Sequence, residues 1–436
     1  MRPDRTRDVA RRIVLAMLEG ELDETALRER MMRAFRPITP WLVELAVREV
    51  RRLRGASPDH DALVERVLED ASFQHAVTQQ ALPKLRYLEV SPAAPAQLRF
   101  AEVPAIESSV ALASWLGVKQ HELRSFADTW RDAAPAESPL RHYRYAWRSR
   151  EYGPDRLIEI PKRRLRAMQR RVLAEILNRI AAHEAAHGFV RGRSPVTHAR
   201  LHAGRDWVLR VDLEQFFPSI AAARVRGVFR WIGYADGVSC DLAALCTSRV
   251  PAAILARAPH APMPWFDRQR YREAHLPQGA PTSPALANLV ARQLDARLAA
   301  FASRCGLVYS RYADDLTFSG ETRDRAARAR ILRIVATIAE DSGFRVNHRK
   351  TCVFGRATAQ RVTGIVVNRH ANISRNEFDC MKAILTNALR HGPHSQNRDD
   401  RPDFRAWLQG KLAWYRSINP ARTAKLDMLF ARIVWD

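Results

Sequence analysis

Two adjacent carboxylates inside a strand pattern restrict what this chain can fold into. The segment RYADDLTFSG, residues 311–320, places Asp314 and Asp315 between short runs of aromatic and branched residues. Such runs favour strands, so the segment predicts two strands joined by a tight turn. Two carboxylates this close repel each other unless a cation lies between them, and hard divalent cations prefer carboxylate oxygens. A solvated Asp-Asp turn is the alternative, because Asp is a common turn residue.

A third carboxylate also lies at the end of a predicted strand. The segment DWVLRVDLEQFF, residues 206–217, has an apolar strand core that ends at Asp212, about a hundred residues before the pair. If this strand lies beside the hairpin, three carboxylates converge. That arrangement can hold two Mg²⁺ ions about 3.5–4 Å apart for an in-line phosphoryl displacement. One ion would activate a primer hydroxyl, and both would stabilise charge on the transferring phosphorus.

The charge of the chain predicts a polyanionic partner. The 436 residues include 71 Lys and Arg against 47 Asp and Glu, a formal net charge of +24 spread along the whole length. Nucleic acid is the usual partner of such a protein, and an anionic membrane surface is the alternative. We find no apolar run of about 18 residues and no signal peptide, so we expect a cytoplasmic protein without a membrane span. The five cysteines show no CxxC spacing and predict reduced thiols, not a zinc site.

Strand and helix patterns alternate irregularly, which predicts an α+β fold. The first 75 or so residues have helical periodicity, and the connector SPAAPAQ at 91–97 is a candidate boundary. Ser108 is a candidate cap for a helix that Gly117 would end. Further along we expect a strand and then a helix in 156–177, a helix in 283–298, a helix in 325–341, strands at 344–347 and 361–368, and three helices from 375 onward.

The helix expected after residue 162 is unusually basic. Its apolar stripe leaves five arginines on other faces, with few acidic partners: Arg163, Arg164, Arg166, Arg170 and Arg171. Phosphate contact is the interpretation we favour, and an ordinary solvated face is the alternative.

Five segments occur in the order found in reverse transcriptases: VDLEQFF, LPQGAPTSPALANL, YADDLTFSG, NHRKT and VTGIVVN. Together they resemble the retron reverse transcriptases over roughly residues 105–436. The resemblance implies a right-hand polymerase with an α+β palm. It would comprise a helical extension (1–100), fingers and an RNA-contacting region (101–204), a palm (205–370, with a fingers insertion at 220–275) and a helical thumb (371–436).

The resemblance also implies roles for single residues. Asp212 and Asp314 correspond to the two principal metal ligands and Asp315 to a weaker third, with Mg²⁺ as cofactor and Mn²⁺ as a substitute. Phe217 corresponds to the bulky residue under the sugar, which selects deoxynucleotides by clashing with a 2′-hydroxyl. The remaining nucleotide-binding positions are Gln278, Gly279, Lys350 and Arg156. Taken singly, Phe217 could be ordinary core, Gln278-Gly279 a plain turn and Lys350 a solvated charge.

Two further segments resemble retron enzymes specifically. AHGFVRGRS, residues 186–194, is similar to the string that precedes the palm, and VTGIVVN resembles an element implicated in RNA recognition. Its candidate RNA-binding residues are Thr363, Gly364 and Asn368, with an ordinary bulged strand as the alternative. The family's Asn-Ala-x-x-His keeps its histidine here as His202, a fourth RNA-binding candidate. The chain departs from that pattern at His198, where the family has Asn.

By the same resemblance, the reaction is Mg²⁺-dependent, RNA-templated DNA synthesis from deoxynucleoside triphosphates. Synthesis would start at the 2′-hydroxyl of a guanosine in a cognate structured noncoding RNA and give a branched RNA–DNA product. A role in defence against phage, alongside a separately encoded effector protein, is also implied. In the thumb, phosphate contact or a solvated surface is open for four cations: Lys411, Arg416, Arg422 and Lys425.

Several other functions compete with this interpretation. HEAAH at 183–187 fits the HExxH pattern of zinc hydrolases, with His183 and His187 as ligands and Glu184 as base. Against it, Gly188 follows at once, and Val190 occupies the glycine position of the extended motif. A non-enzymatic RNA-binding scaffold would explain the charge, but all three carboxylates are present. Within the enzyme class, group II intron maturases and other bacterial defence-associated reverse transcriptases are the rivals.

Overall fold

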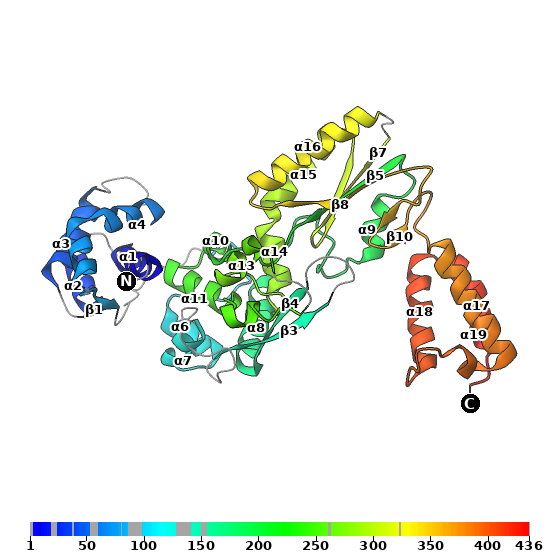
Figure 1. The fold of residues 1–436 in the computed structure, drawn as a ribbon, viewed down its shortest axis with the longest axis horizontal. Helices are drawn as coiled ribbons and strands as arrows, with labels where there is room; N and C mark the ends of the chain where they lie inside the picture. The colour runs from blue at the N-terminus through cyan, green and yellow to red at the C-terminus, as the bar shows by residue number, and fades with distance from the viewer. Residues whose placement is uncertain are drawn as a thin grey trace. The chain divides into compact units, whose positions relative to one another are not determined.

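A computed structural model describes residues 3–18, 24–36, 39–52, 60–79, 81–85, 98–127, 141–149, 155–259, 263–321 and 324–435 (Figure 1). The expected connector at 91–97 lies outside these ranges. The chain divides into two compact units. One contains residues 1–131 and 226–245, and the other contains residues 132–225 and 246–436.

The first unit is mainly helical. Helices α1 to α5 (Pro3–Leu18, Glu24–Ala34, Pro40–Arg52, His60–Glu69, Ala71–Thr78) surround one apolar core, with a short pairing of β1 (Phe35–Arg36) and β2 (Lys84–Leu85). Helix α6 (Ser109–Leu116) begins and ends as expected: the Ser108 hydroxyl accepts a hydrogen bond from the Ala111 N–H, and Gly117 has a φ of 71°. Helix α7 (Gln120–Ala127) follows. The unit also takes in parts of α10 (Ala222–Ile232) and α11 (Asp236–Cys246).

The second unit is built on an antiparallel sheet with the strand order β6-β7-β5-β8. The predicted hairpin is confirmed as β6 (Val308–Tyr312) and β7 (Asp315–Gly320), and the strand that carries Asp212 is β5 (Trp207–Leu213). The strand expected at 344–347 is instead the ten-residue β8 (Val346–Gly355). The polar stretch HRKT gave no strand pattern in the sequence. Strand β8 lies at the edge of the sheet, and an edge strand tolerates charged side chains that a central strand would not.

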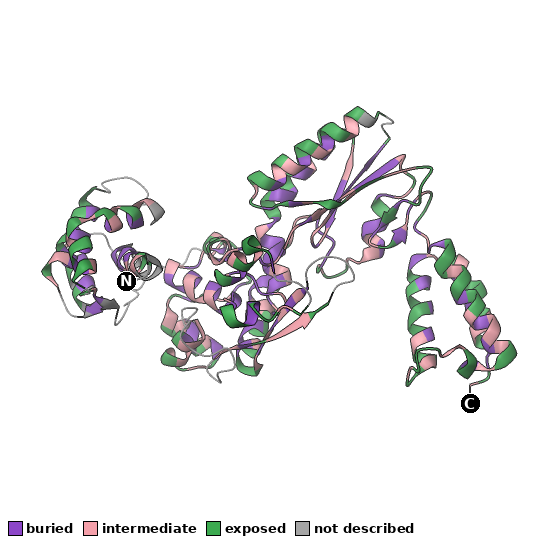
Figure 2. Cartoon of the chain, in the orientation of Figure 1, coloured by how far each residue is buried: buried purple, intermediate pink, exposed green. Residues whose placement is uncertain are grey.

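Helices cover the sheet. In Figure 1, α15 (Arg292–Arg304) and α16 (Arg325–Asp341) lie on one side of it and α9 (Pro195–Leu201) on the other. Figure 2 shows buried residues concentrated in the strands between them. The helix expected at 283–298 is two helices, α14 (Ser283–Val290) and α15, which meet at Ala291. The shorter elements of this region are η1 (Leu177–Arg179), α12 (Ala252–Leu255) and α13 (Trp265–Arg272).

Two hairpins flank the sheet. The first pairs β3 (Tyr143–Arg148) with β4 (Arg156–Pro161), and α8 (Arg163–Glu175) follows directly. The second replaces the single strand expected at 361–368: β9 (Arg361–Val362) and β10 (Ile365–Val366) enclose a two-residue turn. Both turn residues, Thr363 and Gly364, have positive φ, at 48° and 85°. That combination defines the hairpin turn that matches strand twist, so the expectation of one continuous strand was wrong.

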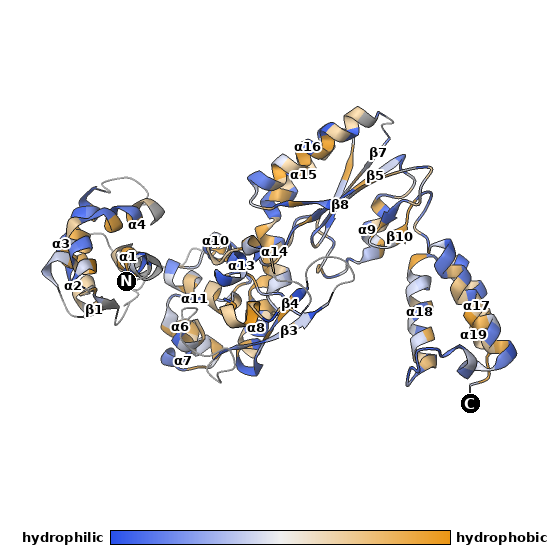
Figure 3. Cartoon of the chain, in the orientation of Figure 1, coloured by the Kyte–Doolittle hydropathy of each residue, from blue (hydrophilic) through white to orange (hydrophobic). Residues whose placement is uncertain are grey.

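The C-terminal helices are confirmed as α17 (Arg375–His391), α18 (Phe404–Ile418) and α19 (Pro420–Ala431), with η2 (Pro393–Gln396) between the first two. Each carries both hydrophobic and hydrophilic residues (Figure 3), as amphipathic helices do. Their apolar residues share a core with Val196 of α9 and Val208 of β5. None of the helices in the described ranges is long and apolar enough to cross a membrane.

Candidate active site

The three predicted carboxylates meet at one end of the sheet. Asp212 on β5 is the register partner of Asp315 on β7, and the backbone N–H of Leu213 donates to the carbonyl oxygen of Asp314 at 2.9 Å. The turn between β6 and β7 has only two residues, and Ala313 adopts a φ of 57°. Positive φ is unusual for a residue with a side chain, so the surrounding structure must hold this turn.

Different cations neutralise the opposed carboxylates. The Arg210 guanidinium donates to Asp315 from two nitrogens, with Nε at 3.0 Å and Nη2 at 2.5 Å from Oδ2. Lys350 Nζ lies 3.5 Å from Asp212 Oδ1, and the side-chain amide of Asn347 donates to the same oxygen at 3.3 Å. Like charges directly opposite each other in a ladder are destabilising, so these partners are needed.

Asp314 remains the least compensated of the three. Burial raises the pKa of its carboxyl and the negative charge of Asp212 raises it further, whereas Arg156 and Lys350 pull it down. Burial also raises the pKa of Asp315, against the opposing effect of Arg210. A buried carboxylate with another beside it favours a bound cation. Asp212 and Asp314 therefore fit a divalent metal, whereas the oxygens of Asp315 are engaged by Arg210.

Metal coordination here would depend on oxygens from outside the chain. Among the described residues, no group of three His, Cys, Asp or Glu side chains is placed to hold a metal ion. Mg²⁺ is commonly held by one or two carboxylates together with waters and substrate phosphates. Two carboxylates at the sheet end suit that mode of binding better than a closed all-protein site.

The predicted Gln278-Gly279 loop packs against strand β4. Gly279 has a φ of 136°, and a Cβ there would lie 2.7 Å from the carbonyl oxygen of Glu159. The Glu159 N–H donates to the Gln278 carbonyl oxygen at 2.9 Å. Strand β4 begins at Arg156, whose charge acts on Asp314, so this strand connects the Gln278-Gly279 loop to a residue that acts on the carboxylates. Only glycine permits this approach of two backbones.

Phe217 lies in an aromatic group with Phe216 and Phe189. It is partly exposed, and its ring centroid is 5.6 Å from that of Phe216 and 6.1 Å from that of Phe189. Phe216 is buried, so the two residues of the FF pair divide between core and surface.

Comparison with known proteins identifies the family. Residues 151–367 match the family described as reverse transcriptase (RNA-dependent DNA polymerase). The chain is 40% identical over 333 residues to the retron Mx65 reverse transcriptase of Myxococcus xanthus, covering 76% of this chain and 73% of that protein. It is 37% identical to the retron Mx162 reverse transcriptase of the same organism, across 73% of this chain and 65% of that protein, slightly less than two thirds. The retron Ec86 reverse transcriptase of Escherichia coli is 34% identical over 237 residues, 53% of this chain and 66% of that protein.

The chain is a retron-type reverse transcriptase. It is an RNA-directed DNA polymerase, and its mixed helix and sheet structure agrees with the α+β fold that this family implies.

The HEAAH segment of this reverse transcriptase does not form a zinc motif. Residues 183–187 contain a turn at 184–185 and a bridge at Ala186 but no helix, so His183 and His187 do not share a helix face. His183 Nδ1 accepts a hydrogen bond from the Ala185 N–H, and His187 Nδ1 is 3.1 Å from the Thr197 hydroxyl. The helical premise of the zinc hydrolase alternative is wrong, because the chain here runs beside strand β6 instead of coiling.

His202 occupies a core position in the reverse transcriptase. It is fully buried, and its ring nitrogens are 2.8 Å from the Ser319 hydroxyl and 2.7 Å from the Ser310 hydroxyl. The side chain thereby ties α9 to strands β6 and β7. This placement offers no surface to RNA, so we revise the RNA-binding assignment of His202 to a structural one.

A cluster of three histidines lies next to Tyr312, the residue that precedes the β6–β7 turn. The rings of His187, His198 and His202 follow one another at centroid distances of 5.6 Å, and His198 also approaches Tyr312. Burial lowers the pKa of His187 to about 4 and that of His198 to about 3, and it lowers the pKa of His202 as well. Neighbouring positive charges, Arg193 for His187 and Arg210 for His198, act in the same direction.

The other RNA-binding candidates lie on and beside the β9–β10 hairpin. Gly364 is exposed at the turn, and the Thr363 hydroxyl donates to the carbonyl oxygen of Pro195 at 3.2 Å. The Asn368 side chain accepts from the Gln360 N–H and donates to the carbonyl oxygens of Arg356 and Thr358. Gly364 in the turn is therefore accessible from solvent, whereas the side-chain amide of Asn368 stabilises the loop of residues 356–360.

The basic helix α8 borders a cavity of about 570 Å³. Its lining includes five cations: Arg144, Lys162, Arg163, Arg166 and Arg170. Arg171, on another face of the same helix, pairs with Glu175 at 3.0 Å. In the C-terminal helices, Arg416 pairs with Asp427 and Arg422 donates to the Ile373 carbonyl oxygen, while Lys411 and Lys425 are exposed.

Several residues of the site were not predicted from the sequence. Arg210 is the partner of Asp315, and a buried pair of Glu159 and His275, 2.8 Å apart, links β4 to the segment before Gln278. Arg311 and Asp295 form a second fully buried pair at 2.6 Å. The alternation of β5 places Arg210 on the same face as Asp212, and that signal could have found it.

Proposed function

We propose that this reverse transcriptase copies a cognate structured noncoding RNA into single-stranded DNA by a two-metal mechanism. The observation that carries the proposal is the meeting of Asp212 and Asp314 at one end of the sheet, with Lys350 and Arg156 acting on the same carboxylates. Mg²⁺, or Mn²⁺ in its place, would be held by Asp212 and Asp314, with Asp315 as a third ligand if it leaves Arg210. The bound ions would lower the barrier by activating the primer hydroxyl and stabilising charge on the transferring phosphorus.

The surrounding residues bind and orient the nucleotide. Lys350 is about half exposed (52%), so its ammonium group can leave Asp212 for the triphosphate and protonate the pyrophosphate. Arg156 pairs with phosphate oxygens, a role that suits a guanidinium. Gln278 and Gly279 form the loop against the incoming nucleotide. Phe217 lies under its sugar and excludes a 2′-hydroxyl by steric clash.

The RNA is recognised away from the carboxylates. We assign phosphate contacts to the cations that line the cavity at α8, and specific contacts to the turn at Thr363 and Gly364. In this assignment residues 1–100 are an extension, 101–204 the fingers, 205–370 the palm with a fingers insertion at 220–275, and 371–436 the thumb. Lys411 and Lys425 of the thumb lie along the template–primer duplex, because Arg416 and Arg422 already have partners within the chain.

The product is a branched RNA–DNA molecule. Synthesis starts from the 2′-hydroxyl of a guanosine in the noncoding RNA, and the system acts in the cytoplasm against phage with a separately encoded effector protein. The relatives support the retron assignment over an intron maturase or another defence-associated reverse transcriptase, because those reported above are all named as retron enzymes.

The test is to express the protein with its upstream noncoding locus and characterise the nucleic acid that copurifies. Aliquots are digested with RNase or DNase, beside an Asp314→Asn, Asp315→Asn double variant. We expect a discrete DNase-sensitive species whose mobility shifts after RNase treatment and which the variant lacks. RNA alone in both samples would refute self-primed synthesis.

A further inference from the structure

The segment His187-Gly188-Phe189 lies directly against the β6–β7 turn, which consists of Ala313 and Asp314. A Cβ at residue 188 would be 2.5 Å from the backbone nitrogen of Ala313, so only glycine fits there. The next residue, Phe189, has a φ of 62° although it carries a bulky side chain. Such a conformation is strained and persists only where neighbouring contacts enforce it. Contacts around this segment must therefore hold Phe189 in place.

Backbone hydrogen bonds first join this segment to strand β6. The Arg311 N–H donates to the Ala185 carbonyl oxygen at 2.7 Å, and the His187 N–H donates to the Arg311 carbonyl oxygen at 2.7 Å. Ala186 and Arg311 are thereby paired in parallel. The Arg193 guanidinium further stabilises the segment by donating to the carbonyl oxygens of Glu184 and Ala186. The segment is thus fixed in register with the strand that leads to Asp314.

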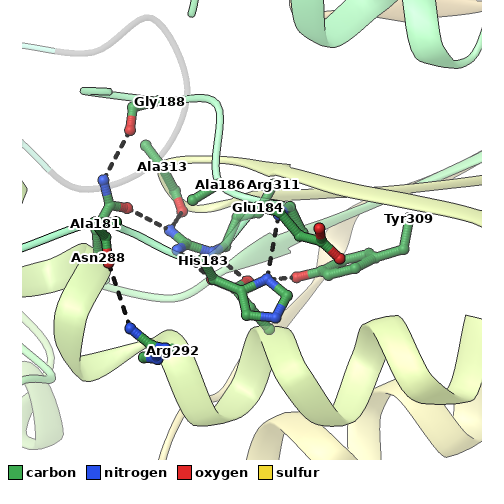
Figure 4. Close-up of polar contacts among 12 residues, drawn as sticks. Ala181, His183, Glu184, Ala186, Gly188, Asn288, Arg292, Tyr309, Arg311 and Ala313 are labelled. Carbon is green, nitrogen blue, oxygen red and sulfur yellow. Dashed lines mark hydrogen bonds and ion pairs between the residues drawn. The ribbon is translucent and has the colours of Figure 1, made fainter. Parts of the chain in front are cut away.

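The Arg311 side chain then links the turn, a helix and the segment (Figure 4). It is fully buried, and it donates from Nη1 to the Ala313 carbonyl oxygen at 2.9 Å and to Asn288 Oδ1 at 3.1 Å. The Asn288 amide in turn donates to the Gly188 carbonyl oxygen at 2.9 Å. Asp295 neutralises the guanidinium through two short hydrogen bonds and also accepts from the Tyr309 hydroxyl.

This network ends in an exposed aromatic ring beside the nucleotide site. Phe189 is 52% exposed, and its ring lies 6.1 Å from that of Phe217 at an angle of 51°. The separation is that of an interacting aromatic pair. A strained backbone conformation at Phe189 thus accompanies a half-exposed ring, and backbone outliers of this kind cluster at functional sites.

We propose that Phe189 is a specificity-determining residue that forms, with Phe217, an aromatic wall around the sugar of the incoming nucleotide. The inference rests on the proposed role of Phe217 in excluding the 2′-hydroxyl. Phe189 keeps the Phe217 ring from tilting away and narrows the space that a ribose would need. Asn288 and Arg311 are positioning residues: they hold Gly188 and Ala313 together, so that the wall and Asp314 keep their spacing.

The test is single-nucleotide incorporation with a deoxynucleotide and with the matching ribonucleotide, on an RNA template with a DNA primer. Phe189→Ala is compared with Phe217→Ala and with the double variant. We expect Phe189→Ala to raise KM for the deoxynucleotide about tenfold, with kcat little changed, and to relax the discrimination against the ribonucleotide. The effects of the two single variants should be non-additive, because the rings are in contact.

A second variant separates positioning from folding. Asn288→Asp keeps an acceptor for Arg311 but loses the donor to Gly188, and its thermal unfolding is measured beside its kinetics. We expect relaxed sugar discrimination in a variant that still unfolds cooperatively, at a melting temperature lowered by the loss of one buried hydrogen bond. Should Asn288→Asp fail to fold, Asn288→Ala removes the donor to Gly188, together with the acceptor for Arg311, without adding a charge.

The outcomes distinguish this inference from the proposed function. Wild-type discrimination and KM in Phe189→Ala would overturn the inference. If Phe217→Ala alone relaxed discrimination, the polymerase assignment would stand while the role of Phe189 would fall. Wild-type discrimination in a folded Asn288 variant would overturn the positioning role. A wild-type enzyme that incorporated neither nucleotide would overturn the proposed function itself, and the inference with it.

Discussion

Asp212 and Asp315 are direct partners in the β5–β7 ladder, and each carboxylate has its own cation, Lys350 for Asp212 and Arg210 for Asp315. Asp314, next to them, has no such close ion pair among the described side chains, although burial raises the pKa of Asp315 as well as its own. The three carboxylates are therefore not equivalent, and their substitution should have different consequences.

Asn substitutions should separate stability from catalysis. Asp314→Asn removes a buried charge that the fold disfavours, so we expect a higher melting temperature in metal-free buffer and a loss of polymerisation on the order of a thousandfold or more. Asp315→Asn breaks the pair with Arg210 and should cost about 1–3 kcal/mol of stability. Thermal unfolding in EDTA and primer extension measure the two effects. If the two variants changed the melting temperature and the rate of primer extension equally, this division of roles would be contradicted.

The cluster of His187, His198 and His202 should make the protein sensitive to acid. The pKa of His187 is lowered to about 4 and that of His198 to about 3, so between pH 6.5 and pH 4 the unfolded chain binds more protons than the folded one. The free energy of unfolding is therefore highest above pH 6.5. Below that pH it falls by about 1.4 kcal/mol per pH unit for each histidine that stays neutral in the folded protein.

His198→Asn tests this directly, because it removes one titrating group at the position where the family has Asn. Chemical unfolding between pH 7 and pH 4.5 should show a slope smaller by about one proton. An unchanged slope would mean that His198 does not remain neutral in the folded protein.

The cavity at α8 should contribute to the salt dependence of RNA binding. Arg163→Ala and Arg170→Ala each remove a cation from its lining, and for each phosphate that is no longer neutralised the slope of log K against log salt should fall by about 0.7–0.9. Arg171→Ala is the matched control on the same helix, because Glu175 already neutralises that side chain. Filter binding of the noncoding RNA at several salt concentrations gives the slopes. Equal effects of all three substitutions would argue for a diffuse charge effect.

Two glycines in open space, Gly364 in the β9–β10 turn and Gly227 in helix α10, should change stability in opposite directions when replaced by Ala. Gly364→Ala forces a Cβ into a conformation with φ of 85°, although nothing lies within 4 Å, so it should destabilise the hairpin by about 1 kcal/mol. Gly227→Ala, in helix α10 with equally open space, should stabilise the protein by about 0.5–1 kcal/mol. Thermal unfolding distinguishes them. A neutral Gly364→Ala would mean that the turn relaxes freely.

Local patterns in the sequence predicted the hairpin, the strand of Asp212, helix α16 and the C-terminal helices, because each depends on residues close in the chain. The pairs that support the site could not be predicted in this way. Glu159 and His275 are 116 residues apart, and Arg210 and Asp315 are 105 apart, so only the tertiary fold brings the members of each pair together. The same limit explains His202, whose two serine partners lie more than a hundred residues away. Its motif identified a position in the family but gave no information on its burial.

The most direct test of the account is incorporation of one deoxynucleotide by the purified protein on an RNA template with a DNA primer, across a Mg²⁺ titration. Wild type is compared with Asp212→Asn and Asp314→Asn. We predict Mg²⁺-dependent extension by the wild type, abolished by EDTA, and activity in both variants lower by on the order of a thousandfold at every Mg²⁺ concentration. Extension by either variant at a rate close to that of the wild type would show that catalysis does not depend on these carboxylates, and it would contradict the account.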